Sequence, residues 1–403
     1  MAVSLDLNLI SLIAFYAILA VFLYVKRKKI TVQSKILFLY KTERFNKLMR
    51  SIANKHPKFW RAFGLLSIPV GFGAMIFIFA YLSWKLVEMF FVPVPPIQII
   101  LPFTSTVSVG PILFISFWYF IISIFAVILV HEGAHGVVAE AFKQKIKSAG
   151  VGLAAIIPLA FVEPDEEKLQ KAPTSTQLAI FSAGAMMNFV TAAIILLVSL
   201  FVVAPVVLAA VEPQGVEIYG LTNGFPAELA GLQVGDRIIA ANGIAVSNPQ
   251  EFSRIIGNLT PGDVISVETD RGTFDVTTIA NPRDESQAHI GVAIRAADLQ
   301  VKPELKERFG NLPLALLYIY NPLAANLPEQ GLLQWIFVLN LGIGLINLLP
   351  LGAIDGGRMA SIVLQRKIKD QAKAKRMFSI ISTASILLII FNIIGPYLVR
   401  TVM

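Results

Sequence analysis

The residues best suited to do chemistry form one pentapeptide, His131-Glu132-Gly133-Ala134-His135, which has the spacing HExxH. On a helix, residues four positions apart share a face, so both imidazoles can converge on one metal ion. Glu132 then projects beside them, toward a water molecule at the metal. Two of the chain's four histidines lie in this pentapeptide. The pattern predicts that His131 and His135 bind zinc and that Glu132 acts as a general base.

Two histidines are too few for a catalytic zinc site, which usually has three protein ligands and leaves one position for water. The chain has no cysteine, which excludes a thiolate ligand, a cysteine nucleophile and a disulfide framework. His56 and His289 lie in other parts of the sequence, so we expect a carboxylate as the third ligand. The acidic candidates are Glu140, Glu163, Asp165 and Asp355.

Asp355 fits the third ligand best. Glu140 is half a helical turn away from the face of the histidines, and Glu163 and Asp165 belong to the acidic run EPDEE, which is typical of solvated chain. Asp355 stands in NLLPLGAIDGGR, where an apolar run ends and glycines permit tight backbone turns next to a ligand.

These residues must be positioned by membrane helices. The composition, 56% hydrophobic and 15% charged, excludes an ordinary soluble enzyme. Six apolar runs have the length of about 17 to 25 residues that a bilayer-spanning helix needs. They are Leu9–Val25, Phe63–Leu82, Ile112–Val130, Leu178–Val203, Leu332–Leu349 and Phe378–Val399. We predict an α-helical polytopic membrane protein with about six transmembrane helices, the first of them a retained anchor.

Charge sets the expected orientation. Lys26–Arg61 holds twelve basic residues and one acidic residue, and Arg358–Arg376 holds seven and one. Basic loops face the cytoplasm, so the active site is expected toward the cytoplasmic side of a prokaryotic cell membrane. The run Leu314–Ala325 is too short to span and is interpreted as an interfacial segment.

A different pattern occupies Glu212–Leu312, which has eight basic and fourteen acidic residues. Short alternating strands are expected at Arg237–Ala240, Val264–Glu268 and Phe274–Thr277, and Asn242-Gly243 is a hairpin turn. The segment GFPAELAGLQVGDRIIAANGIAV resembles PDZ domains of bacterial proteases. We therefore expect an inserted, β-rich, PDZ-like domain on the extracytoplasmic side, and no nucleic-acid partner.

The motifs together resemble a known family. HEGAH, with Asn347-Leu348-Leu349-Pro350 followed by Asp355-Gly356, resembles the site-2 protease family of intramembrane zinc metalloproteases, whose patterns are HExxH and NxxPxxxxDG. Gly184 and Asn188 resemble the family's GxxxN element. The resemblance implies that His131, His135 and Asp355 bind Zn²⁺ and that Glu132 is the base.

The resemblance also suggests residues that handle the substrate. Asn188, or another amide donor, is a candidate to stabilise the oxyanion, and Asn347 is a candidate substrate-binding residue; hydrogen bonding between helices is the alternative role for both. The apolar, glycine-containing segment Ser148–Val162 predicts a β-hairpin beside the site. A strand edge there, around Gly152, could accept an unwound substrate as an added strand; an interfacial loop without substrate contact is the alternative.

The predicted organisation has four parts. They are an anchor span with a basic cytoplasmic loop (1–62), the first part of the protease core (63–211), the PDZ-like domain with a linker (212–312), and the second part of the core with a C-terminal span (313–403).

The predicted function is hydrolysis of peptide bonds in or near the transmembrane segments of single-span membrane proteins, within the lipid bilayer. Resemblance alone adds anti-sigma or regulatory factors, trimmed outside by another protease, as substrates. One alternative is a membrane-chamber zinc peptidase that cleaves soluble or lipidated peptide termini. Another is a non-catalytic membrane scaffold that uses the PDZ-like domain.

Overall fold

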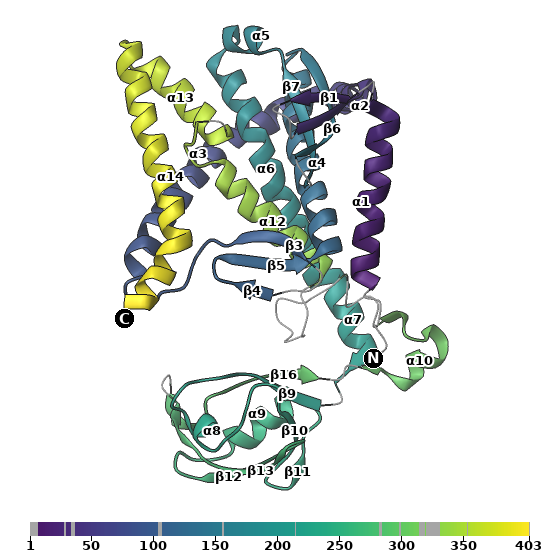
Figure 1. Cartoon of the computed structure of the whole chain (residues 1–403), viewed down its shortest axis with the longest axis vertical. Coiled ribbons are helices and arrows are strands. Elements are labelled where there is room, and N and C mark those ends of the chain that lie inside the picture. Colours follow the sequence, from purple (N-terminus) through teal and green to yellow (C-terminus); the bar gives the residue numbers. More distant parts are fainter. Residues whose placement is uncertain are drawn as a thin grey trace. The chain divides into compact units, whose positions relative to one another are not determined.

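The computed structural model describes residues 7–27, 30–33, 37–103, 107–154, 157–213, 215–281, 284–297, 300–313, 319, 331–352 and 354–402 (Figure 1). The chain divides into two compact units. The first unit comprises residues 1–194 and 335–403, and the second comprises residues 195–334. The predicted interfacial segment Leu314–Ala325 lies, apart from one residue, outside the described residues.

Helices dominate the first unit. They are α1 (Leu7–Lys26), α2 (Glu43–Lys55), α3 (Pro57–Glu88), α4 (Phe117–Ala141), α5 (Glu166–Lys171), α6 (Thr174–Val198), α12 (Leu332–Asn347), α13 (Asp355–Lys367) and α14 (Gln371–Val402). Helix α6 continues into the second unit through the π-helical turn η2 (Ser199–Val203) and α7 (Ala204–Ala210). Within the described residues, five helices are long and apolar enough to cross a membrane. The prediction of a polytopic helical membrane protein is confirmed, whereas the number six is not.

Two predicted spans differ from the structure. Helix α12 has 16 residues, about 24 Å at 1.5 Å per residue, which is shorter than the roughly 30 Å hydrocarbon core. It ends at Asn347 because the chain turns there toward Asp355. The predicted span Ile112–Val130 begins too early, since its β-branched start forms strand β5 (Ile112–Ser116), which pairs with β3 (Ile99–Phe103) and β4 (Val107–Val109).

Small side chains fill the contact between α4 and α6. Ala134 and Ala139 of α4 pack in one buried cluster with Ala179 and Ala183 of α6. The carbonyl oxygen of Ile180 on α6 also contacts His135 of α4. The two helices that carry HExxH and GxxxN are therefore direct neighbours, which the site requires.

A four-stranded sheet lies against α4. Its order is β1 (Ile30–Gln33), β2 (Leu37–Lys41), β6 (Ile146–Ala154) and β7 (Ile157–Pro164), and each neighbouring pair is antiparallel. The predicted hairpin is confirmed as β6 and β7. Strand β2, from the basic segment after α1, covers the free side of β6, so β7 is one edge strand of this sheet and β1 is the other.

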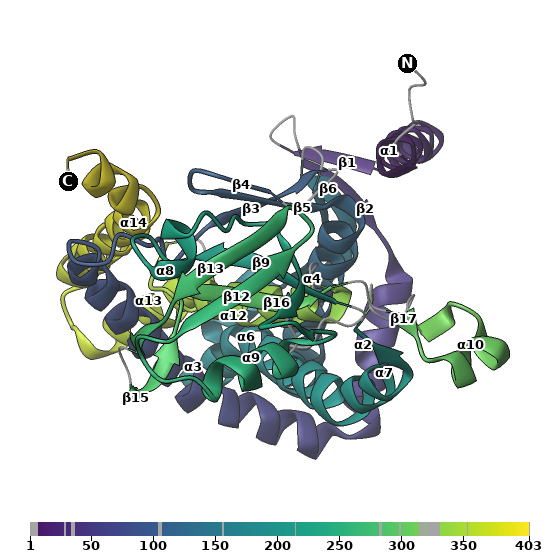
Figure 2. The same cartoon turned by 90° about the horizontal axis from the view of Figure 1, so that it is seen from below.

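The second unit contains a β domain of residues 215–297. Its strands run in the order β13 (Gly272–Thr277), β12 (Val264–Thr269), β10 (Arg237–Ala241), β9 (Gly215–Leu221) and β16 (Val292–Ala297). Figure 2 shows β9, β12, β13 and β16 of this sheet. The remaining elements are α8 (Pro226–Leu229), β11 (Ile244–Ala245), α9 (Pro249–Gly257), β14 (Ile279–Asn281) and β15 (Asp284–His289). The three predicted strands are present, each one or two residues longer than expected.

The predicted hairpin turn joins β10 to β11. Asn242 and Gly243 have φ of 50° and 74°, the positive values that a two-residue type I′ turn requires at both central positions. Outside the β domain, the unit has the pair β8 (Val211–Glu212) with β17 (Gln300–Val301), followed by α10 (Pro303–Phe309).

Candidate metal site

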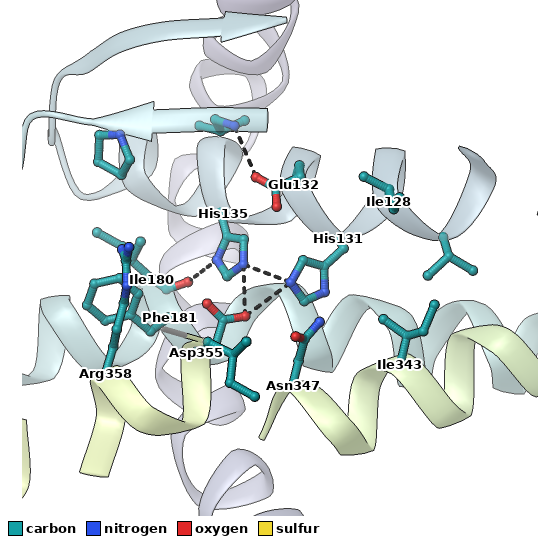
Figure 3. Close-up of a pocket in the computed structure, with 14 residues that line it drawn as sticks. Ile128, His131, Glu132, His135, Ile180, Phe181, Ile343, Asn347, Asp355 and Arg358 are labelled. Carbon is teal, nitrogen blue, oxygen red and sulfur yellow. Dashed lines mark hydrogen bonds and ion pairs between the residues drawn. The ribbon is translucent and has the colours of Figure 1, made fainter. Parts of the chain in front are cut away.

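Three side chains from two separate segments meet at one point in the first unit (Figure 3). His131 and His135 of α4 bring their Nε2 atoms to 3.1 Å from each other. Asp355 Oδ2, at the start of α13, lies 3.1 Å from Nε2 of His131 and 3.2 Å from Nε2 of His135. Two ligands of a tetrahedral zinc bound at about 2.0–2.1 Å are separated by about 3.3 Å, so the three atoms fit one zinc ion.

A backbone carbonyl sets the tautomer of His135. Its Nδ1 lies 2.6 Å from the carbonyl oxygen of Ile180 on α6. Because the carbonyl can only accept, Nδ1 carries the hydrogen and Nε2 keeps its lone pair for a metal. Zinc-binding histidines usually have such a partner on the other nitrogen.

Asn188 is the corresponding partner of His131. Its Nδ2 lies 3.1 Å from His131 Nδ1, and its Oδ1 is buried without a partner. With the amide turned over, Oδ1 accepts from Nδ1–H of His131, which leaves Nε2 of that ring free for the metal. The side chain is fully buried. Its position behind the ring supports orienting His131 rather than the predicted oxyanion contact.

Gly184 of α6 leaves the space that an ion needs. A Cβ atom at this position would lie 2.4 Å from Nε2 of His135 and 2.7 Å from Nε2 of His131. Both distances are below ordinary contact distances, so the absence of a Cβ keeps the space in front of the two nitrogens open. The cradle at Gly184 thus fits a metal ion, and a side chain there would fill it.

Asp355 is placed by glycines beside it. A Cβ at Gly356 would lie 2.2 Å from the carbonyl oxygen of Leu348, and one at Gly357 would lie 1.6 Å from that of Leu351. The first turn of α13 can therefore pack directly on the chain that leaves α12. This contact carries Asp355 back to the histidines of α4.

The other carboxylates considered as ligands are engaged elsewhere. Glu140 forms an ion pair with Arg50, at 3.2 Å. Glu163 accepts from the hydroxyl of Ser148 at 2.6 Å, and Asp165 lies near two lysines. Among the described residues, Asp355 is the acidic side chain that joins the histidines in a group able to hold a metal.

Glu132 stands between the histidines and the sheet. One of its carboxylate oxygens accepts a hydrogen bond of 3.0 Å from the backbone N–H of Val162, on the edge strand β7 (Figure 3). Both residues line a cavity of about 280 Å³ together with His131, His135 and Asp355. The cavity also reaches Asn347 at the end of α12, where a predicted substrate-binding residue should lie.

Gly152 is not brought to the cavity. It lies on β6, paired with Leu39 of β2 on one side and Leu159 of β7 on the other. Its backbone is therefore not at an open edge, and a strand added to this sheet would pair with β7 instead. The prediction of an accepting edge near Gly152 was one strand away from the edge strand of the structure.

The sequence reasoning missed several residues of the cavity, among them Arg358 and Phe181. Arg358 and Phe181 line it beside the ligands, with the guanidinium of Arg358 5.2 Å from the centre of the Phe181 ring. Arg358 lies three residues after Asp355, so the two residues are neighbours on one helical turn, and this spacing could have indicated Arg358. The sequence held no such indication for Phe181, which is one more apolar residue of a predicted span.

The fold and the site together define a polytopic membrane protein with a His-His-Asp metal site and an adjacent glutamate. Residues 119–391, more than half of the chain, match peptidase family M50, and the chain belongs to this family.

Individual proteins show the same relationship. The chain is 29% identical over 245 residues to zinc metalloprotease RasP of Shouchella clausii, covering 50% of this chain and 55% of that protein. It is 26% identical over 274 residues to the chloroplastic membrane metalloprotease ARASP of Arabidopsis thaliana, covering 58% and 60%. The chain thus spans little more than half the length of these relatives.

A solved PDZ domain is also similar. It belongs to an SdrC-like protein of Listeria monocytogenes and matches with 23% identity and a TM-score of 0.19, over 20% of this chain and 87% of that structure.

Proposed function

We propose that the protein is an intramembrane zinc endopeptidase of the site-2 protease type. The observation that carries this proposal is the convergence of His131, His135 and Asp355 with Glu132 in one cavity between membrane-length helices. Ionisable side chains within membrane-spanning segments are costly and are usually functional. The cluster has three ligands and a neighbouring carboxylate, as hydrolytic zinc sites do.

A zinc ion bound by the three ligands would lower the pKa of a water molecule to about 7 and polarise the scissile carbonyl. Glu132 takes the proton of the attacking water and passes it to the leaving amine. Ile180 and Asn188 hold the two imidazoles in orientation through their Nδ1 atoms. Asn347 lines the cavity, which supports a role as a donor to the substrate or to its oxyanion.

The surroundings of the site support a proposal for the substrate class. A peptide bond in a membrane helix is shielded by that helix, so a transmembrane substrate must unwind before cleavage. We propose that the unwound segment of a single-span membrane protein pairs with the edge of β7. Such strand addition supplies main-chain hydrogen bonds without requiring a particular sequence.

The proposed orientation places the basic segments and the end of the bundle with α5 toward the cytoplasm of a prokaryotic cell, and the β domain outside. We propose that the β domain excludes substrates with bulky external parts by size. Arg295 supports this choice over capture of a peptide carboxylate, because its guanidinium is already paired with Glu217 at 2.7 Å.

Replacement of one residue tests the activity. Glu132→Gln should abolish cleavage of a single-span substrate by the purified protein, while zinc stays near one per chain, because all three ligands remain. Soluble peptides offered in parallel test the membrane-chamber alternative. Activity of the variant within a few-fold of the parent protein, or loss of its zinc, would contradict the role of Glu132.

A further inference from the structure

A second cavity, of about 620 Å³, adjoins the catalytic one. The two cavities share Pro164, Phe181 and Arg358 as lining residues. The second is bounded by α5, the start of α6, α13 and the start of α14, so we call it the α5–α13 groove. Since Pro164 ends strand β7, a chain paired along β7 that continues past this residue enters the groove.

Helix α13 presents a polar face to the groove. Arg358, Ser361, Gln365 and Arg366 all line it, and the last three, which follow Arg358 by three, seven and eight residues, lie on the same side of the helix. Three more glutamines line the groove, Gln170, Gln177 and Gln371. The amide nitrogens of Gln177, Gln365 and Gln371 already donate within the chain, and their carbonyl oxygens can accept from the N–H groups of an extended polypeptide.

The charge of the groove is positive. Its lining has two guanidinium groups, of Arg358 and Arg366, and one carboxylate, of Glu166. Neither arginine forms an ion pair with any residue that the structure describes. Arg358 is held over the ring of Phe181, at the boundary between the two cavities, and an arginine fork binds carboxylates well.

We propose that the α5–α13 groove is a subsite for the substrate polypeptide beyond the scissile bond, and that Arg358 and Arg366 select an acidic side chain there. The proposal rests on the proposed protease function. Phospholipid headgroups are the competing occupant, because basic residues also accumulate beside membranes. The shared wall with the catalytic cavity and the row of carboxamides favour a peptide.

The test uses the full-length zinc-loaded protein and a single-span polypeptide substrate whose cleavage site has been mapped by mass spectrometry. Glu, Gln or Lys is placed in turn at each position of the flank on the groove side. At one or two positions, Glu should raise kcat/KM over Lys by about two- to fivefold, as a partly exposed ion pair allows.

Variants of Arg366, which lines the groove but not the catalytic cavity, test whether the preference for Glu arises in the groove. At the flank position nearest residue 366, Arg366→Gln should remove the preference and Arg366→Glu should invert it in favour of Lys, because Arg358 still serves its own position; zinc content should stay near one per chain. Arg376→Gln on α14, outside the groove lining, should keep the original preference. The inverted preference is a gain that a folding defect cannot produce.

Three results would overturn the proposal. They are no charge preference at any flank position, the same preference in Arg366→Glu, and Arg366 variants that change only the response to phosphatidylglycerol in mixed micelles. The last result would assign the groove to lipid headgroups. Absence of cleavage of every substrate by the parent protein would instead contradict the protease function itself.

Discussion

At the scale of single residues, the metal site depends on the absence of a Cβ atom at Gly184. Gly184 faces both ligating nitrogens, and the nearest of them would lie 2.4 Å from a Cβ. The neighbours that would have to move are the ligands themselves, which Ile180 and Asn188 hold from behind. The absence of a side chain at this position is therefore part of the site.

Gly184→Ala should fold but bind zinc poorly. Alanine in place of glycine favours a helix by about 0.5–1 kcal/mol, so α6 itself gains, whereas the added methyl group fills the cradle. We expect zinc well below one per chain by elemental analysis. Gly342→Ala is the matched control, since nothing lies within 4 Å of a Cβ at that position of α12. Full zinc occupancy in Gly184→Ala would show that the ligands can move aside.

The ligands were accessible to sequence reasoning because a single helix fixes their geometry. His131 and His135 share a face of any helix, and Asp355 stood out by its glycines and its position after an apolar run. The hydrogen bond from Val162 to Glu132 could not be predicted, because it depends on how the hairpin packs against α4. The orienting role of Asn188 likewise depends on the contact between two helices.

At the scale of elements, an ion pair fastens the turn before β10 to the turn between β12 and β13. Asp236 is 3% exposed and accepts hydrogen bonds from the N–H of Gln233 and from both Nε and Nη2 of Arg271. The neighbouring guanidinium, with help from the Gln233 N–H, lowers the pKa of Asp236 below its usual value.

Asp236→Asn should destabilise the β domain by about 1–3 kcal/mol, the usual effect of losing hydrogen bonds to a buried charged group. In the parent protein this stabilisation is present above the unfolded-state pKa and is lost as the pH falls through the depressed folded-state value. Hydrogen exchange of residues 215–297 in the intact chain measures it. Asp275→Asn, exposed on β13, should change exchange little; equal effects of both changes would argue against the ion pair.

Elements were predictable where one local pattern dominates. The alternating strands and the Asn242-Gly243 turn of the β domain follow from period and turn chemistry. The start of α4 could not be predicted, because Ile112–Ser116 is as apolar as the helix that follows. This segment forms a strand only by pairing with β3 and β4. The shortness of α12 likewise reflects a chain reversal toward Asp355 rather than a change in hydropathy.

At the scale of the whole molecule, the proposed orientation can be tested with single cysteines, because the chain has none of its own. Ser247 and Ser286 of the β domain and Ser51 of α2 are all exposed. Cysteines at the first two positions should react with an impermeant reagent applied outside cells, and one at Ser51 only after lysis. The reverse pattern would invert the topology.

The proposed size exclusion by the β domain predicts that removal of this domain allows additional substrates to be cleaved. Replacing residues 216–295 with a short flexible linker should allow cleavage of substrates that still carry a folded external domain. Trimmed substrates should be cut at nearly the original rate, which serves as the control. If trimmed substrates are cut poorly and untrimmed ones stay resistant, the domain captures substrate instead.

The hydrogen bond between Glu132 and the edge of β7 has a consequence for timing. The amide hydrogen of Val162 is donated to the carboxylate of Glu132, the proposed base. A carbonyl group of an incoming strand would compete for that same hydrogen. The carboxylate of Glu132 would then need another hydrogen-bond donor. Water is the donor that hydrolysis requires. Pairing of the peptide with β7 would therefore free the carboxylate of Glu132 to accept from water in the same step.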